Sequence, residues 1–341
     1  MPDKRLVAAD SNDDDAQFEA GLRPRRLADF TGQTRLKENL QIAIDAARKR
    51  GDAMDHVLLY GPPGLGKTTL AAIIAQELEV GFQQTSGPVL QKKLDLSGIL
   101  STIQYRQVFF IDEIHRLLPD VEEMLYSALE DFHLDILIGA GPGARTHSIP
   151  LQKFTAIGAT TRQGLVSAPL RGRFGLVLRM NHYDVPELQK IVERSARLLD
   201  TPIDEEGAAE IARRARGTPR IANRLLRRVR DYAQVRARGH INLDVSKTAL
   251  NLLEVDPFGL DEIDQKIMRT VLEKFGGGPV GIGTIAASIG EEAETIEEVY
   301  EPYLIQLGFL HRSPRGRVAT DGSYDYFKVP RRFRGGQPEL F

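Results

Sequence analysis

The amino-acid sequence predicts an α/β protein in which a parallel-sheet domain precedes a small all-helical domain and a C-terminal winged-helix domain. Three observations lead to this prediction. Short apolar runs alternate with amphipathic helical segments in the first half of the chain, which is typical of buried parallel strands. A glycine-rich loop at residues 61–68 follows the first run. After residue 186 helical periodicity takes over, and a strand–turn–strand pattern follows near residue 313.

The sheet elements follow from the apolar runs. The predicted strands lie at residues 56–60, 108–111 and 154–157. After the first strand, apolar residues recur at the spacing of one helix face, at Leu70, Ile73, Ile74 and Leu78. The alternation of strand and helix favours parallel pairing, since each helix returns the chain to the same end of the sheet.

Breaks in composition divide the chain into domains. The first 20 residues carry a net charge of −4, which is typical of a disordered tail. The turn signal Asp256-Pro257-Phe258-Gly259 separates the second domain from the third. We therefore expect an acidic disordered tail at 1–20, the sheet domain at 21–183, the helical domain at 184–256, the winged-helix domain at 257–335 and a short tail at 336–341.

Composition and charge exclude several classes of protein. The 341 residues carry a net charge of −2, which excludes a uniformly basic nucleic-acid binder but not a local basic patch. The absence of cysteine excludes disulfides, a thiol nucleophile and a cysteine zinc site. No apolar run approaches the ~18 residues of a membrane span, and residues 1–10 lack the apolar stretch of a signal peptide. We expect a cytoplasmic protein without a membrane partner.

The loop Gly61-Pro62-Pro63-Gly64-Leu65-Gly66-Lys67-Thr68 matches the phosphate-binding pattern G-x-x-x-x-G-K-[ST]. Glycines such as Gly64 and Gly66 let backbone N–H groups turn inward around a phosphate. Lys67 is expected to reach the β- and γ-phosphates, and the Thr68 hydroxyl to hold Mg²⁺. The helix that begins here adds the positive end of its dipole. The sequence therefore predicts a site for ATP and Mg²⁺.

Two acids, Asp112 and Glu113, follow the second apolar run. In P-loop enzymes an acid at this place holds Mg²⁺, and we assign that role to Asp112. Glu113 is then placed to polarise the attacking water, which favours hydrolysis over nucleotide binding alone. His115 is interpreted as a polar contact or cap and not as a metal ligand, because no second ligand lies at metal spacing.

The order of these motifs resembles that of the AAA+ ATPases and, among them, the RuvB family of Holliday junction branch-migration motors. The likeness covers nearly the whole chain after residue 20 and implies a AAA+ domain, a lid domain and a winged-helix head. The segments that carry it are LRP at 22–24, FTGQ at 30–33, GPPGLGKTTL at 61–70, FFIDEIHRL at 109–117, GATTR at 158–162, APLRGRFG at 168–175 and GTPRIANRLLRRVRD at 217–231.

The resemblance implies roles for further residues. Thr161 matches the polar residue that senses the γ-phosphate, and Arg220 matches the second sensor. Arg173 matches the arginine finger, which acts on the nucleotide of a neighbouring subunit and so makes hydrolysis depend on a ring. Other expected nucleotide contacts are Leu22, Arg23 and Tyr183 beside the base and ribose, Thr69 in the loop, and Glu130, Asp131 and Phe132 from across a subunit boundary.

A β-hairpin is predicted between the second and third strands. Apolar residues 134–138 lead into a glycine- and proline-rich turn, and apolar residues return at 149–151. In the family that this chain resembles, a hairpin here docks the junction-binding subunit RuvA, and an exposed apolar tip would suit that role. Periodicity leaves open the alternative of an ordinary core hairpin. The resemblance further implies a homohexamer on DNA, association with RuvC, and a part in recombination, DNA repair and the SOS response.

The last domain has three helical segments followed by a strand–turn–strand wing at residues 309–319. Arg312, Arg315 and Arg317 of this wing are expected to contact the phosphates of duplex or junction DNA. The third helical segment begins with five glutamates between residues 291 and 298, which opposes insertion into the major groove and predicts little reading of base sequence. A protein-binding winged helix is the alternative.

Two other functions are compatible with parts of the sequence. An ATP-gated switch, such as a clamp loader or initiator, usually carries a zinc-binding insertion or a collar domain, and this chain has no cysteine. A DNA-binding regulator would read bases, which the acidic third helix disfavours. Ten arginines in residues 211–240 also suggest DNA, but the apolar stripe of their helix favours a lid surface. We therefore predict an ATP-driven DNA translocase that migrates Holliday junctions.

Overall fold

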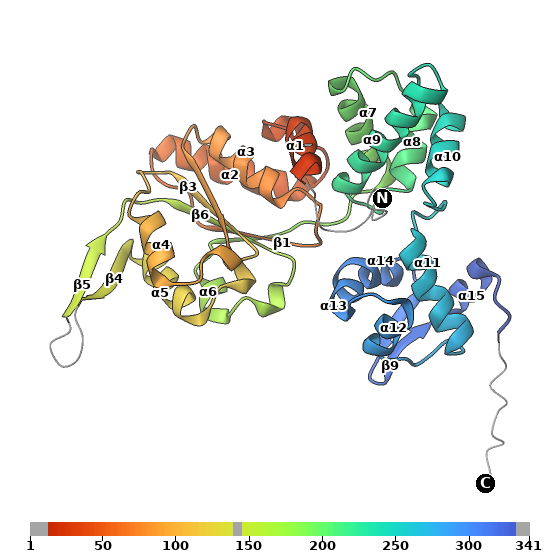
Figure 1. The fold of residues 1–341 in the computed structure, drawn as a ribbon. Coiled ribbons are helices and arrows are strands. Elements are labelled where there is room, and N and C mark those ends of the chain that lie inside the picture. The colour runs from red at the N-terminus through yellow and green to blue at the C-terminus, as the bar shows by residue number, and fades with distance from the viewer. Residues whose placement is uncertain (1–12, 139–144, 332–341) are drawn as a thin grey trace, which may run out of the picture. The chain divides into compact units, whose positions relative to one another are not determined.

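The computed structural model of this protein describes residues 13–138 and 145–331 of the chain (Figure 1). This part forms two compact units. The first runs from residue 14 to 198 and includes residues 217–220, and the second comprises residues 199–216 and the chain from residue 221 onward. Among the described helices, none combines the length and the apolar character that crossing a membrane would require.

A five-stranded parallel sheet forms the centre of the first unit, in the order β2-β3-β6-β1-β7. Its strands are β1 (Val57–Tyr60), β2 (Phe82–Ser86), β3 (Val108–Asp112), β6 (Thr155–Thr160) and β7 (Leu176–Arg179). The three predicted strands are confirmed as β1, β3 and β6, which are the central strands. Because all five strands are parallel, their carboxyl ends meet at one edge, where ligands bind in open α/β sheets.

The edge strands β2 and β7 were not predicted from the sequence. No residue of β2 is buried, and Leu178 is the single buried residue of β7. Edge strands are covered less completely than central ones, so they lack the continuous apolar run that identifies a buried parallel strand.

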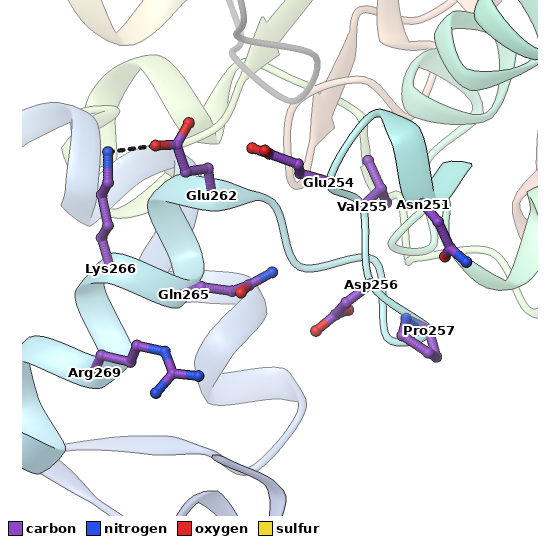
Figure 2. Close-up of a pocket in the computed structure, with 9 residues that line it drawn as sticks. All are labelled: Asn251, Glu254, Val255, Asp256, Pro257, Glu262, Gln265, Lys266 and Arg269. Atoms are coloured by element: carbon purple, nitrogen blue, oxygen red, sulfur yellow. Dashed lines mark ion pairs between the residues drawn. The ribbon is translucent and has the colours of Figure 1, made fainter. Parts of the chain in front are cut away.

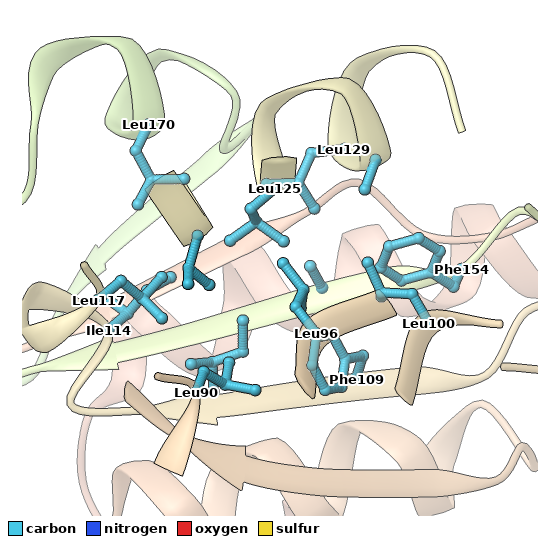
Figure 3. Close-up of a cluster of buried hydrophobic side chains, with 14 of the residues drawn as sticks. Leu90, Leu96, Leu100, Phe109, Ile114, Leu117, Leu125, Leu129, Phe154 and Leu170 are labelled. Atoms are coloured by element: carbon cyan, nitrogen blue, oxygen red, sulfur yellow. The ribbon is translucent and has the colours of Figure 1, made fainter. Parts of the chain in front are cut away.

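Helices cover both faces of the sheet (Figure 1). They are α2 (Thr34–Arg50), α3 (Lys67–Glu77), α4 (Lys93–Leu100), α5 (Pro119–Glu130) and α6 (Ala168–Gly172), with 3₁₀ turns at Leu27–Asp29, Gly87–Val89, Ile114–Arg116 and Gln163–Leu165. Helix α7 (Val185–Leu198) follows β7 in the chain. On the face shown in Figure 3, Leu96, Leu125 and Leu170 from α4, α5 and α6 pack around Phe109 and Phe154. Burying each of these side chains contributes about 1.5–3 kcal/mol, so this core fixes β3 and the acids at its end.

The prediction of a disordered tail is wrong for its last part, because Asp13–Leu22 form helix α1. Leu22 is buried at the end of this helix, and Glu19 is buried and paired with Arg220. The charge of the tail predicts disorder, and nothing in the local sequence indicates these tertiary partners. The remaining residues of the predicted tail, 1–12, lie outside the described residues.

The predicted hairpin is confirmed as the antiparallel strands β4 (His133–Ile138) and β5 (Arg145–Pro150), which form a sheet of their own. The hairpin extends away from the main sheet (Figure 1). Leu134 at its base is buried in the core, whereas its cross-strand partner Ile149 is 39% exposed. The base of the hairpin thus belongs to the core, and the predicted tip at residues 139–144 lies outside the described residues.

The second unit begins with the lid helices α8 (Glu205–Arg213), α9 (Pro219–Arg236) and α10 (Leu243–Leu252). The apolar stripe predicted for α9 is buried throughout, at Ile221, Leu225, Leu226 and Val229. Helix α7 lies in the first unit, where Arg194 donates to the carbonyl of Leu22 over 3.0 Å.

Two arginines before α9 are buried, contrary to the expectation of a charged lid surface. Arg214 and Arg216 are each 3% exposed. Arg214 donates to the carboxylate of Glu210 over 2.6 Å. Arg216 pairs with Asp264 and stacks on the ring of Tyr303, 4.8 Å from its centre. Since Asp264 and Tyr303 belong to the C-terminal part, Arg216 joins that part to the lid.

The C-terminal part has the predicted winged-helix elements. Its elements are α11 (Glu262–Arg269), a π-helical turn (Thr270–Lys274), α12 (Ile282–Ile289), α13 (Ala293–Thr295), a second π-helical turn (Ile296–Tyr300), α14 (Glu301–Gln306), β8 (Leu310–Ser313), β9 (Gly316–Ala319) and α15 (Asp321–Phe327). The wing is the antiparallel pair β8 and β9. Helix α15 was not predicted; its residues Ser323 and Phe327 are buried.

Candidate functional site

The phosphate loop joins the end of β1 to the start of α3. Gly64 in this loop has a φ of +77°, a conformation that residues with a side chain rarely adopt. A Cβ atom at Gly64 would also come within 3.1 Å of the Arg220 side chain. Glycine is therefore required here both for the backbone conformation and for space, as a loop that wraps closely around a phosphate demands.

Lys67 is the first residue of α3 and is 8% exposed. Its ammonium group donates to the carbonyls of Gly61 and Pro62, each over 2.8 Å. Burial lowers the pKa of Lys67 to about 8, an effect that nearby Asp112 opposes and Arg220 reinforces. A buried cation held by neutral acceptors fits a role in binding phosphate, whose charge would restore the ordinary pKa.

Thr68 and Asp112 meet as predicted. The Thr68 hydroxyl donates to Asp112 Oδ2 over 3.1 Å, which joins the start of α3 to the end of β3. One hydroxyl and one carboxylate are oxygen ligands of the kind that Mg²⁺ takes together with nucleotide phosphates and water. The described residues include no group of three acidic or histidine side chains that could hold a metal alone. The donor set therefore fits Mg²⁺ bound together with a nucleotide.

Glu113 follows β3 in a left-handed conformation, with a φ of +47°. Its N–H donates to Asp112 Oδ1 over 2.9 Å, and its carboxylate pairs with Arg116 over 3.1 Å. Both side chains of this pair are about half exposed, so the pair contributes about 0–1 kcal/mol and can open easily. The structure thus places the predicted base beside Asp112. Arg116 was missed, although the three-residue spacing of opposite charges was a signal for it.

The polar contact predicted for His115 is made with Thr160. Nδ1 of His115 lies 3.0 Å from the Thr160 hydroxyl at the end of β6. Burial lowers the pKa of His115, so its ring is neutral at neutral pH. Thr161, the predicted sensor, comes directly after the strand and is exposed. The strand was expected at residues 154–157, and the structure extends it to Thr160.

The residues predicted to hold the base and ribose differ in exposure. Leu22 and Tyr183 are buried, whereas Arg23 is exposed. The Tyr183 hydroxyl donates to the carbonyl of Leu65 in the phosphate loop over 3.3 Å, and burial raises the pKa of Tyr183. The structure therefore brings Tyr183 to the loop directly. Thr69, also predicted to contact the nucleotide, is buried in the first turn of α3.

Arg220 is held beside the phosphate loop by two contacts. Its backbone N–H donates to the carbonyl of Gly64 over 3.3 Å. Its side chain pairs with Glu19 of α1, with 3.4 Å between Nε and Oε2. Glu19 was missed because it lies in a segment that the sequence indicated as disordered, and no local pattern connects it to Arg220.

Arg173 is engaged within its own chain. Its guanidinium pairs with Glu130 over 2.8 Å, donates to the carbonyl of Pro169 over 2.8 Å and lies 4.4 Å from the ring centre of Tyr126. Arg173 and Glu130 were both predicted to act at the nucleotide of a neighbouring subunit. In this structure they form an ion pair with each other within one chain.

Asp131 and Phe132, the other two residues predicted to act across a boundary, lie in the turn after α5. Asp131 is exposed. Phe132 instead packs its ring against His56 and Phe154, at centre distances of 6.0 and 5.8 Å. Its side chain thus contributes to the core of its own unit in this structure.

The wing arginines have unexpected partners. Arg312 and Arg317 face each other across β8 and β9, and both donate through Nε to Glu301 Oε1 over 3.0 Å. Glu301 is fully buried, and Glu297 adds a second carboxylate to the pair. Arg315 in the turn is exposed. Two of the three arginines predicted to contact DNA are therefore paired with carboxylates in this structure.

A cleft of about 550 Å³ lies elsewhere in the second unit (Figure 2). Its lining runs from Asn251 at the end of α10 through the linker to Arg269 of α11. Glu262 and Lys266 form an ion pair on its wall. None of the predicted nucleotide or DNA residues lines this cleft.

Three family models together match most of the chain. The model described as the Holliday junction DNA helicase RuvB P-loop domain matches residues 22–180. The RuvB AAA lid domain matches residues 183–256, and the RuvB C-terminal winged helix domain matches residues 257–328.

Similar proteins carry matching names. A Holliday junction branch migration complex subunit RuvB from Solibacter usitatus (strain Ellin6076) is 76% identical and covers 100% of this chain and 99% of its own. The subunit of the same name from Koribacter versatilis (strain Ellin345) is 62% identical, over 96% of this chain and 91% of its own. The solved structure of the Thermotoga maritima RuvB Holliday junction branch migration motor is 51% identical, with a TM-score of 0.83 over 91% of this chain and 100% of its own.

We expect nucleotide binding to take up a proton at Lys67 in alkaline solution. The pKa of Lys67 is lowered to about 8, and phosphate charge raises it, so the ammonium re-forms on binding above that pH. Isothermal titration calorimetry at about pH 8.5, in buffers of different ionisation enthalpy, should detect uptake of up to one proton per nucleotide. Lys67→Arg is the control, because its guanidinium stays charged. Equal uptake by this variant would contradict the assignment.

Glu301→Gln should destabilise the winged-helix part. The substitution removes the buried charge that both wing arginines share, and breaking such a pair costs about 3 kcal/mol. Hydrogen exchange of the β8 and β9 amides should accelerate accordingly. Arg315→Ala, a change at an exposed position, should stay within about 0.5 kcal/mol of the parent. If both variants exchanged alike, Glu301 would not hold the wing.

Proposed function

Because this chain belongs to the RuvB family of AAA+ ATPases, we propose that it hydrolyses ATP with Mg²⁺ to drive branch migration of Holliday junctions. The observation that carries the proposal is the convergence of Lys67, Thr68, Asp112 and Glu113 at the carboxyl edge of the sheet. A nucleotide switch needs the first three residues, whereas turnover also needs a base such as Glu113.

The chemistry follows from the positions of these groups. Lys67 and the N–H groups of the loop bind the β- and γ-phosphates. Thr68 and Asp112 would hold Mg²⁺, which would supply positive charge to the phosphates when bound. Glu113 accepts a proton from the water that attacks the γ-phosphorus, and the bond to the β–γ bridging oxygen breaks to give ADP and phosphate. Glu113 has to leave Arg116 for this step, which the exposure of that pair makes inexpensive.

Other residues sense or position the nucleotide in this proposal. Thr161 and Arg220 serve as the two sensors of the γ-phosphate, and the contact of the Arg220 backbone with Gly64 supports the second role. Leu22, Arg23 and Tyr183 hold the base and ribose, which the contact of Tyr183 with the loop supports.

We propose further that Arg173 acts in a neighbouring subunit of a homohexamer. A guanidinium at the γ-phosphate stabilises the charge of the transition state and is worth about 10³–10⁵ in rate. To act there, Arg173 has to leave Glu130 of its own chain, with which it now pairs. Assembly of the ring would supply this exchange, since a neighbour's phosphates attract the guanidinium more strongly than an exposed carboxylate does.

The assembly that we propose follows the family. The β4–β5 hairpin docks RuvA, and the wing contacts duplex DNA through its phosphates, with Arg312, Arg315 and Arg317 as the contact residues. RuvC joins the larger complex, and the protein works in the cytoplasm. The proposed domains are residues 21–183, 184–256 and 257–335.

The proposed function is tested by ATP-dependent migration of a synthetic four-way junction in the presence of RuvA. Lys67→Ala should abolish ATP turnover, and Glu113→Gln should retain ATP binding but lower turnover by about 10²-fold or more, as loss of a general base does. Arg171→Ala, at an exposed position of α6, should retain activity. If the parent protein consumed no ATP with Mg²⁺, junction DNA and RuvA all present, the proposal would fail.

A mixing experiment tests the proposed role of Arg173 as an arginine finger. Arg173→Ala subunits mixed in equal amounts with parent subunits should lower ATP turnover well below the mean of the two pure samples, because each variant subunit disables its neighbour. The same mixture with Arg171→Ala should give the mean. Additive rates in the Arg173→Ala mixture would place the arginine at its own subunit's nucleotide.

A further inference from the structure

The wing contains two carboxylates that a simple DNA contact does not require. Glu301 accepts from both arginines through both of its oxygens, in a bidentate arrangement with Arg312 and with Arg317. Glu297 adds a third oxygen, which lies 3.2 Å from Arg317 Nη2 and 3.5 Å from Arg312 Nη2. Two guanidiniums and two carboxylates together carry no net charge, so the cluster contributes no net attraction for DNA.

The two glutamates differ in burial, and this difference separates their roles. The side chain of Glu301 is 1% exposed, so its charge serves the fold by pairing with two like-charged arginines that sit directly opposite each other on the wing. The side chain of Glu297 is 43% exposed, so it meets the arginines from the solvent side. The fold does not need Glu297, since Glu301 already satisfies the Nε and Nη2 donors of both arginines.

We propose that Glu297 is a counter-charge that competes with DNA phosphates for Arg312 and Arg317 and thereby lowers the affinity of the wing for duplex DNA. The inference rests on the proposed contact of the wing with DNA. A phosphate that approaches the arginines replaces the Glu297 oxygen and gains only the difference between two charge-assisted hydrogen bonds. When the phosphate leaves, Glu297 takes its place, so Nη2 of each arginine regains a second carboxylate beside that of Glu301. A weak, quickly reversed contact suits a protein that moves along DNA.

The test is the affinity of the full-length protein for a labelled 30-bp duplex, measured by fluorescence anisotropy with Mg²⁺ and a non-hydrolysable ATP analogue. Glu297→Gln keeps the size and the acceptor oxygen but removes the charge. We expect binding about three- to tenfold tighter at about 100 mM salt, and a plot of log affinity against log salt that is steeper by about 0.9, as one additional phosphate contact produces. The melting temperature should not change.

Glu262→Gln is the matched control. Its side chain is 42% exposed and pairs with Lys266 over 2.6 Å on α11 (Figure 2), so the substitution makes the same change of charge in a similar ion pair away from the wing arginines. Its duplex affinity should stay within about 1.5-fold of the parent at this salt, because salt weakens the effect of an exposed charge that is paired with Lys266 and not with the wing arginines. Equal tightening by both variants would assign the effect to overall charge and would overturn the proposal.

Arg315→Ala separates failure of this inference from failure of the proposed DNA contact. This exposed arginine lies in the turn between β8 and β9 of the wing. If Arg315→Ala weakens binding while Glu297→Gln leaves it unchanged or weakens it, the wing contacts DNA but Glu297 is not a competitor. If neither substitution changes the affinity, the wing does not contact DNA and both proposals fail.

Discussion

A hydrogen bond from Thr68 to Asp112 crosses the carboxyl edge of the sheet, and the geometry of the nucleotide site depends on it. The strands that deliver these residues are not neighbours, because β6 lies between β1 and β3. The loop after β1 and the turn after β3 must therefore meet above the end of β6. Gly158 in β6 helps to make this possible, since a Cβ atom there would lie 2.8 Å from Ile114 in the turn that follows Glu113. Close packing at one strand thus helps to bring the Thr68 hydroxyl and the Asp112 carboxylate together.

The parts of the fold that could be predicted are those whose signal is local. Three such signals are the phosphate loop, the acids after β3 and the apolar stripe of α9. Each spans a few consecutive turns or strand residues, and each is present in the structure. Contacts between distant segments could not be predicted. Glu19 meets Arg220 across 201 positions, and nothing in either segment indicates the other. The wing shows the same limit, because the sequence indicates three arginines in a short segment, and only the fold reveals that Glu301 pairs with two of them.

Charge was the least reliable guide to environment in this chain. The arginine-rich segment suggested a solvated surface, yet Arg214 and Arg216 are among its most buried residues. A buried guanidinium is costly unless carboxylates or carbonyls satisfy its donors, and each of these arginines has such partners. Arg216 directly precedes the residues Gly217–Arg220, which belong to the unit that contains the phosphate loop. Arg216 therefore contacts Asp264 and Tyr303 of the winged-helix part, and it lies only a few residues before Arg220, the proposed second sensor.

The carbonyl partners of Lys67 have a consequence for the interval in which the loop holds no nucleotide. A protein that exchanges its nucleotide in every round must tolerate the interval between one occupant and the next. Gly61 and Pro62 offer the ammonium group two acceptors inside its own loop, so the departure of a phosphate does not strand a buried cation. The nucleotide-free loop therefore keeps the ammonium group hydrogen-bonded between two rounds, so release of the product carries no large energetic penalty.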